Sequence, residues 1–259
     1  MTEKTKTIWK AISAVVVIIL TAIGVYAALV QADILDNPRA AKTTTAPTVT
    51  QAGIGSTDPT NSAEPQLAVG DITHFGSYDW RVLDIDTVYN RALLLSEDII
   101  EQRPYNTEFT DVTWETCTLR AYLNSSFYGS FNEGDRSRIA LTRNINPDNT
   151  WGRTKGVAFG TPGGNPTDDY IFLLSVAEIL KHFPGLRLYK DSDGDEWYYE
   201  ADERLVSKFN NSGSWWWLRS PGYYQDYAAG VDNDGYVYLS GNNVNYETGG
   251  VRPALWLNL

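Results

Sequence analysis

Residues suited to ligand recognition are concentrated in one run of the chain, between residues 223 and 249. Tyr offers rigid amphipathic contact area at a low entropic cost, while Asn, Ser and Gly offer adaptable hydrogen bonding. A run built of these types is typical of evolved recognition surfaces, so we expect it to bind a ligand, either a protein or a glycan. The candidate ligand-binding residues are Tyr223, Tyr224, Asp226, Tyr227, Asp232, Asn233, Asp234, Tyr236, Tyr238, Ser240, Asn242, Asn243, Asn245 and Tyr246.

The same run also fits a plainer interpretation, a Gly- and Asn-rich β-meander with ordinary turns such as Asp234-Gly235. Composition alone weighs the two interpretations about evenly. If the run is a ligand-directed surface, its Tyr, Asn and Asp side chains should stand exposed in one contiguous patch. The sparse valines, Val231, Val237 and Val244, should then point inward.

Two apolar segments bracket this run and are expected to position it. Residues 215–220 predict a central strand, and residues 254–257 predict a closing one. In a strand, Trp215 and Trp217 share one face and Trp216 takes the opposite face. We therefore favour a core role for the three tryptophans over a platform on which a carbohydrate stacks.

An acidic run at residues 191–196 is the one metal-like cluster in the sequence. Alternating carboxylates suit a hard cation such as Ca²⁺. The calcium-loop pattern, however, requires Gly at its sixth position and Glu at its twelfth, where this chain has Glu196 and Asp202. We favour an acidic, Gly-containing turn between strands, and we predict neither a metal nor a cofactor.

The first strands of the globular part are expected at residues 72–75 and 80–85, joined in a hairpin by Gly76-Ser77. A third apolar strand is expected at residues 91–95, and a further strand at 170–174.

Three helices are expected. Ser96 can cap a short one over residues 96–100. A second runs over residues 114–128, with Leu119, Tyr122 or Leu123, and Phe127 as its buried stripe. A capping box of Ser175 and Glu178 starts the third, which reaches about residue 183. Residues 143–167 lack periodicity and predict a long surface loop, a feature that is often functional.

Composition limits the possible partners. The net charge of −11 argues against nucleic acid as a partner and fits a solvated extracellular protein. Cys117 is the single cysteine, so no disulfide can form within the chain, and its apolar spacing indicates a small buried residue.

The N-terminal region predicts a membrane anchor. Lys4, Lys6 and Lys10 precede an uncharged apolar run at residues 11–30, which is long enough to cross a bilayer. The positive charge places the N-terminus in the cytoplasm and the C-terminal domain outside. We favour a single-pass signal anchor over residues 1–32, although cleavage after Ala27 or Ala32 stays open. Residues 33–66 predict a disordered Thr/Pro/Ser linker, and residues 67–259 one ectodomain.

Several motifs carry a resemblance to a known family. They are Trp-Leu-Arg-Ser-Pro-Gly at 217–222, Gly-Val-Arg-Pro-Ala-Leu-Trp at 250–256, Phe-Gly-x-Tyr-x-Trp-Arg-Val-Leu at 75–83, and Trp-Glu-x-Cys-x-Leu-Arg-x-Tyr-Leu-Asn at 114–124. Residues 70–259 resemble a widespread bacterial family of uncharacterised extracellular domains. The C-terminal segment is similar to the variable region of proteins that diversity-generating retroelements alter, on a C-type-lectin-like and formylglycine-generating-enzyme-like fold.

This resemblance implies an α+β fold: a C-type-lectin-like domain with antiparallel sheets, two to three helices and long loops, here preceded by one transmembrane helix. The terminal strands of such a fold pair, which would set residues 254–257 beside the opening hairpin. Mutagenesis of template adenines would convert Asn codons into codons for Tyr, Asp, Ser, Gly, Ala, Leu or Val. Nearly every non-framework residue from 223 to 249 belongs to that set, with Gln225 and Glu247 as the departures.

Two classes of function remain. The formylglycine-generating relatives oxidise a substrate cysteine with a pair of cysteines, which this chain lacks, so that activity is not expected. No other catalytic set stands out, and we predict that the protein is not an enzyme. We expect a membrane-anchored surface protein that binds a ligand through its Tyr/Asn/Asp-rich C-terminal face. The alternative is a cell-wall or carbohydrate-acting module with unrecognised catalytic chemistry.

Overall fold

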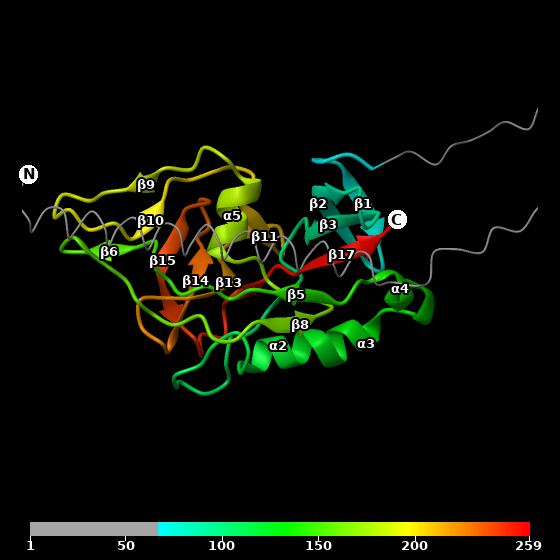
Figure 1. Cartoon of the computed structure of the whole chain (residues 1–259), viewed down its shortest axis with the longest axis horizontal. Helices are drawn as coiled ribbons and strands as arrows, with labels where there is room; N and C mark the ends of the chain where they lie inside the picture. The colour runs from blue at the N-terminus through cyan, green and yellow to red at the C-terminus, as the bar shows by residue number, and fades with distance from the viewer. Residues whose placement is uncertain (1–66) are drawn as a thin grey trace, which may run out of the picture. The chain divides into compact units, whose positions relative to one another are not determined.

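The structure is a computed structural model that describes residues 67–259. The first of its two main sheets has the order β1-β2-β3-β17, with bounds Ile72–Phe75, Tyr78–Asp86, Arg91–Ser96 and Ala254–Asn258. Every neighbouring pair in this sheet is antiparallel. The predicted hairpin through Gly76-Ser77 is confirmed, since Phe75 pairs with Tyr78. The closing strand β17 joins this sheet but pairs with β3, at the opposite edge from β1 (Figure 1). The expected pairing of the terminal strands, which would set β17 beside the hairpin of β1 and β2, is therefore not found.

The second main sheet has seven strands in the order β4-β16-β13-β14-β15-β10-β9. In that order their bounds are Glu101–Gln102, Gly250–Val251, Trp216–Pro221, Tyr227–Val231, Val237–Asn243, Tyr198–Tyr199 and Leu188–Tyr189. The predicted strand at residues 215–220 is confirmed as an interior strand, β13. The pairs in this sheet are antiparallel except for that of β16 with β13, which is parallel.

Three two-stranded sheets complete the strands of residues 67–259. They pair β5 (Thr142–Asn144) with β8 (Thr167–Asp169), β6 (Arg153–Thr154) with β7 (Val157–Ala158), and β11 (Ser207–Phe209) with β12 (Ser212–Ser214).

Arg252 lies where the chain passes from β16 in one main sheet to β17 in the other. Its side chain is only 1% exposed. It donates hydrogen bonds to the carbonyl oxygens of Ser96 at the end of β3 and of Leu205. Its guanidinium also lies 5.0 Å from the ring centroid of Trp216 in β13. One buried cation therefore ties the two sheets together, and burial lowers its pKa to about 10.

The longest helical stretch is α2 (Thr118–Tyr122), continued by the π-helical turn η1 (Leu123–Phe127) and α3 (Tyr128–Ser130). Leu119, Leu123 and Phe127 are buried, so the predicted stripe is confirmed. The helix begins later than predicted because buried Cys117 is its N-cap, with Sγ accepting a hydrogen bond from the backbone N–H of Arg120.

The second predicted helix to be confirmed is α5 (Val176–His182), and both hydrogen bonds of the Ser175–Glu178 capping box are present. The predicted helix at residues 96–100 is wrong. Ser96 ends β3, and the next residues run extended, with the backbone N–H of Ile99 and Ile100 bonded to the carbonyls of Lys208 and Val251. A short polar helix, α4 (Glu133–Arg138), was not expected; Asn132 caps it.

Two predicted segments differ from expectation. Residues 170–174 form no regular strand; they run between β17 and β13 and make a single isolated bridge, from Phe172 to Ala254. Apolar residues on both sides of this segment are fully buried, which fits a chain enclosed on all faces. The loop at residues 143–167 is partly internal, because it contributes β5, β6 and β7 and buries Asn144, Asn149 and Thr161.

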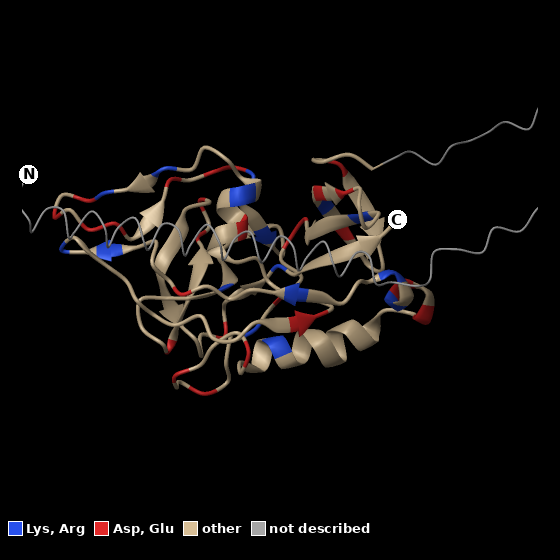
Figure 2. Ribbon diagram, in the orientation of Figure 1, with Lys and Arg blue, Asp and Glu red and all other residues tan. Residues whose placement is uncertain are grey.

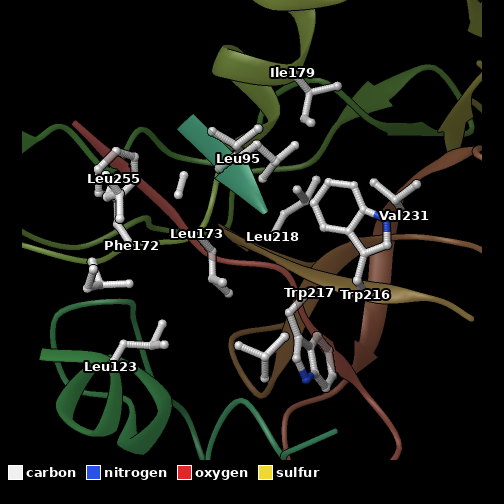
Figure 3. Packing of buried hydrophobic residues seen from close by; sticks show 14 of the residues in the cluster. Leu95, Leu123, Phe172, Leu173, Ile179, Trp216, Trp217, Leu218, Val231 and Leu255 are labelled. Atoms are coloured by element: carbon white, nitrogen blue, oxygen red, sulfur yellow. The ribbon is translucent and has the colours of Figure 1, made fainter. Parts of the chain in front are cut away.

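Buried side chains of the core lie on both faces of the large sheet. Figure 3 shows Trp216 beside Val231 and near Ile179 of α5, with Trp217 on the other side of the strand. Both tryptophans are fully buried, as are Val237 and Val244, so the predicted inward valines and the core role of these tryptophans are confirmed. Sheets, few helices and long loops make the described domain α+β, as expected.

None of the helices within residues 67–259 has the length and apolar character that a membrane crossing requires. The anchor and the linker predicted for residues 1–32 and 33–66 lie outside the described residues.

Candidate ligand-binding face

A row of aromatic side chains crosses one face of the large sheet. Residues directly opposite each other on neighbouring strands point to the same face. Tyr198 of β10 pairs with Tyr189 of β9 on one side and with Tyr238 of β15 on the other. Tyr238 in turn pairs with Gly230 of β14, which pairs with Trp217 of β13. We call Tyr189, Tyr198, Tyr238, Gly230 and Trp217 the open row.

The next residues along the same strands form a second row on the opposite face. Trp216 pairs with Val231, Val231 with Val237, and Val237 with Tyr199, which pairs with Leu188. We call these five residues the core row, since the first three are at most 1% exposed. In the open row, by contrast, Tyr189 is 42% exposed, Tyr198 and Tyr238 are half-buried, and only Gly230 and Trp217 are buried.

Two adjacent hollows lie along the open row. The tyrosine hollow has a volume of about 340 Å³ and is lined by Tyr189, Tyr198, Asp232, Tyr236 and Tyr238. The amide hollow has a volume of about 400 Å³ and is lined by Trp215, Gly230, Val231, Asp232, Asn233, Tyr238, Asn242, Tyr246 and Thr248. Because Asp232 and Tyr238 line both, the two hollows form one continuous groove. Volumes of this size lie at the low end of the range of about 300–1,000 Å³ for small-ligand sites.

Gly230 explains why the groove is open at its centre. Every other member of the open row has an aromatic ring, and Gly230 has no side chain between Tyr238 and Trp217. A Cβ on Gly230 would lie 2.9 Å from the carbonyl oxygen of Trp216 and 3.7 Å from the Trp215 ring. Trp215 lies edge-on against Trp217, with 4.5 Å between ring centroids, and walls the far end.

Six of the fourteen predicted residues line this groove: Asp232, Asn233, Tyr236, Tyr238, Asn242 and Tyr246. They come from β15, from the turn before it and from the segment after it. The turn is built as the sequence predicts, because Gly235 takes a φ of +91°. Asp232 Oδ1 accepts hydrogen bonds from the backbone N–H groups of Asp234 and Tyr236, at 2.9 Å each.

Three predicted tyrosines form a separate aromatic cluster. The Tyr224 ring is 4.5 Å from that of Tyr223 and 5.5 Å from that of Tyr227. Tyr223 also packs on Phe159 at 4.7 Å, and Phe159 is buried in the loop at residues 143–167. Tyr224 is 56% exposed, whereas Tyr223 and Tyr227 are half-buried.

The remaining predicted residues line neither hollow. They are Asp226, Asp234, Ser240, Asn243 and Asn245. Ser240 is only 4% exposed, because the β-bulge at Gly241 (φ +72°) turns this part of β15 into the structure. Among the predicted residues, six thus line the groove and three form the Tyr223–Tyr224–Tyr227 cluster.

Six residues of the groove were not among the predicted ones: Tyr189, Tyr198, Trp215, Gly230, Val231 and Thr248. Tyr189 and Tyr198 come from a hairpin that precedes the predicted run by about thirty residues, and only the pairing of β10 with β15 brings them to it. Trp215 had been assigned to the core, but it is only partly buried. The consecutive aromatic residues at 197–199, next to a polar turn, were the signal that could have indicated Tyr198.

The charge of the groove lining is negative. The lining contains one carboxyl group, that of Asp232, and neither Lys nor Arg. Strands β14 and β15 carry no charged residue along their length (Figure 2). Desolvation raises the pKa of the Tyr198 phenol, and the neighbouring Tyr189 and the carboxylate of Asp191 raise it further.

The acidic run at residues 191–196 forms the turn that joins β9 to β10, as the favoured interpretation holds. Gly194 takes a φ of +84°, and Asp191 Oδ1 accepts hydrogen bonds from the backbone N–H groups of Asp193 and Asp195. Within residues 67–259, no three His, Cys, Asp or Glu side chains are grouped so as to hold a metal.

One buried amide clamps the strands that carry the groove. Asn149 is fully buried, and its Nδ2 lies within hydrogen-bond distance of the carbonyl oxygens of Pro221, Gly222 and Leu239, at 2.9–3.1 Å. These carbonyls belong to the end of β13 and to β15. The loop at residues 143–167 thus fixes the relative position of the two strands from behind.

Comparison with known proteins gives a family. The chain matches the family described as a domain of unknown function (DUF6273) over residues 89–259. No curated protein and no solved structure shows significant similarity to the chain. The matched segment begins in the turn between β2 and β3 and includes every residue of both hollows. Since it covers more than half of the 259 residues, the chain belongs to the DUF6273 family.

Proposed function

We propose that the protein is a membrane-anchored surface receptor or adhesin whose C-terminal domain binds a ligand through the groove along the open row. The observation that carries the proposal is the collection of partly exposed aromatic rings and polar side chains in one groove on a rigid sheet. Binding sites are concave, mostly aromatic or apolar, and contain a few convergent polar groups. The groove supplies five tyrosines, Trp215, Asp232, two asparagines and Thr248.

The scaffold supports the same proposal. The groove-forming strands are fixed from behind by the core row and by the Asn149 clamp, so the rings are held before a ligand arrives. Preorganised aromatic contacts lose little conformational entropy on binding. The groove also carries the amide side chains of Asn233 and Asn242, which offer adaptable hydrogen bonding.

The proposed cellular setting rests on the N-terminal sequence. Lys4, Lys6 and Lys10 ahead of the apolar run at residues 11–30 support a single-pass anchor with the N-terminus in the cytoplasm. Protease added to intact cells should then cut between residues 33 and 66 and release the C-terminal domain. Mature protein found free in the medium, beginning near residue 28 or 33, would instead indicate a cleaved signal.

We further propose a C-type-lectin-like domain whose ligand-binding segment a retroelement diversifies. The first part is supported by the return of the last strand, β17, to the sheet of the first three strands, where it pairs with β3 and not with β1. For the second part, a reverse transcriptase gene and a near-identical, adenine-rich template repeat should lie beside the coding sequence. If the gene neighbourhood contains neither, the segment is not diversified by a retroelement and the binding surface is static.

The binding function is tested by comparing matched tyrosine variants on an array of glycans and cell-surface proteins. Tyr238→Leu alters the centre of the groove, whereas Tyr224→Ser changes an exposed ring of the separate cluster. We expect the signals of the full-length protein to disappear in the first variant and persist in the second. Signals that persist in Tyr238→Leu and disappear in Tyr224→Ser would assign binding to the other cluster.

A further inference from the structure

The lining of the tyrosine hollow consists of four phenol rings and one carboxylate: Tyr189, Tyr198, Tyr236, Tyr238 and Asp232. The rings do not collapse into a single stack. Those of Tyr189 and Tyr198 are parallel, with 4.8 Å between centroids, and the ring of Tyr236 stands at 87° to Tyr198 at 5.6 Å. The hollow is therefore bordered by rings in two nearly perpendicular orientations, which is the arrangement of a partial aromatic cage.

Aromatic faces carry negative electrostatic potential and attract a cation placed within about 6 Å of the ring centroid. The carboxylate adds to this attraction. The side-chain hydrogen bonds of Asp232 within residues 67–259 all end on Oδ1, which leaves Oδ2 for a ligand. No lysine or arginine lines the hollow to compete for the carboxylate. Lys190, the nearest basic residue in sequence to Tyr189, pairs with Glu196 at 3.5 Å.

The charge of the surroundings excludes the opposite kind of ligand. The charge of Asp191 contributes to the raised pKa of Tyr198, so a second carboxylate lies near one of the lining rings. The chain as a whole has a net charge of −11. A phosphate, sulfate or carboxylate group would meet these charges without a basic partner, whereas an ammonium group would meet only favourable ones.

From this geometry we infer that the tyrosine hollow binds an alkylammonium group, such as a quaternary trimethylammonium, on the ligand that the groove recognises. The inference rests on the proposed binding function and specifies the ligand chemistry of that same site. The ammonium lies against the faces of Tyr198, Tyr236 and Tyr238, with Asp232 as its counter-ion. The uncharged remainder of the ligand extends into the amide hollow, where Asn233, Asn242 and Thr248 offer hydrogen bonds.

Choline and its neutral isostere 3,3-dimethylbutan-1-ol provide the direct test, because they share shape and differ in charge. Saturation-transfer NMR on the full-length protein in a polyoxyethylene detergent measures both. We expect choline to bind at least about fivefold more tightly. Asp232→Asn keeps an oxygen for the two backbone N–H groups and removes the charge, so it should abolish this preference. Tyr198→Leu should weaken choline binding by about two- to fivefold, the contribution of one exposed cation–π contact.

Two further ligands, measured in the same way, identify the source of the ammonium group. Tighter binding of phosphocholine would indicate a choline headgroup, and tighter binding of Nε-trimethyllysine would indicate a modified protein side chain; both support the inference. Equal binding of choline and the neutral alcohol would overturn it, as would choline binding that Asp232→Asn leaves unchanged. If array binding depends on Tyr238 while choline does not bind, the cation inference fails and the binding function stands.

Discussion

Trp216 and Trp217 are neighbours in β13, yet they begin two rows that cross the same five strands and end in opposite environments. The core row passes from Trp216 through Val231 and Val237 and stays buried, with α5 and Arg252 packed against it. The open row passes from Trp217 through Gly230 to Tyr238 and Tyr198 and becomes exposed. Successive side chains of a strand point to opposite faces of the sheet. One residue therefore lies in the core and the next lies in a candidate binding site.

The difference shows how stability and recognition can be separated within a single sheet. The core row consists of β-branched or large side chains that fill the interior. The open row consists of aromatic side chains and one glycine. Substitutions in the core row should therefore lower the stability of the domain, and substitutions in the open row should weaken ligand binding. Each of the following substitutions tests that separation.

The largest effect is expected for Trp216→Ala. Its ring is fully buried, and its Nε1 donates a hydrogen bond to the Leu205 carbonyl at 3.0 Å. Removing a buried aromatic side chain costs about 3–5 kcal/mol of unfolding free energy. The matched variant Tyr198→Ala, three strands away in the open row, should cost under about 2 kcal/mol. Urea unfolding followed by tryptophan fluorescence measures both; equal losses would show that the two rows do not differ in this way.

A somewhat smaller loss is expected for Arg219→Met in β13. The Arg219 guanidinium pairs with Glu178 of α5 and donates to the Leu173 carbonyl at 2.7 Å. Arg219 is 3% and Glu178 25% exposed at the side chain. Breaking such a pair leaves a charge without its partner, at a cost of about 3 kcal/mol.

The pH dependence of that loss follows from the pKa of Glu178. Burial by itself would raise this pKa, but the Arg219 guanidinium and the hydrogen bonds of Ser175 bring it below its ordinary value. A group with a lowered folded pKa stabilises the fold above its unfolded pKa and loses this contribution as pH falls through the folded pKa. Wild-type and Arg219→Met stabilities should therefore converge as the solution is acidified below the ordinary range of a Glu carboxyl. A gap that widens in acid would contradict the role of this ion pair.

Sequence patterns could predict one side of this comparison better than the other. The inward valines, the capping box of α5 and the strand at β13 follow from local periodicity and hydrogen bonding. The groove depends on long-range pairing, because Tyr198 reaches Tyr238 only through the register of β10 with β15. The shift of register between Ala228 and Gly230 also breaks the simple alternation, so counting residues does not tell which side chains of β15 face the groove.

An intermediate effect is expected for Asn149→Ala, which removes the clamp behind the groove. The carbonyls of Pro221, Gly222 and Leu239 would lose their shared donor inside the protein. Leaving buried acceptors without partners costs about 1–3 kcal/mol. Asn149→Asp keeps the shape but places a carboxylate against three carbonyl oxygens, so it should be at least as destabilising. Thermal unfolding compares the two, and a stable Asp variant would argue against the clamp.

The smallest effect on stability is expected for the double variant Tyr189→Ser, Tyr246→Ser, at the two exposed ends of the groove. Tyr189 and Tyr246 are 42% and 46% exposed. Exposed positions cost within about 0.5 kcal/mol each. The stacking of Tyr189 on Tyr198 adds at most about 1.5 kcal/mol to the loss. The variant should therefore melt within a few degrees of wild type, measured by circular dichroism, while binding on the array of glycans and cell-surface proteins falls clearly. The opposite result, a strongly destabilised domain that still binds, would place these tyrosines with the core row and remove the distinction on which the binding site rests.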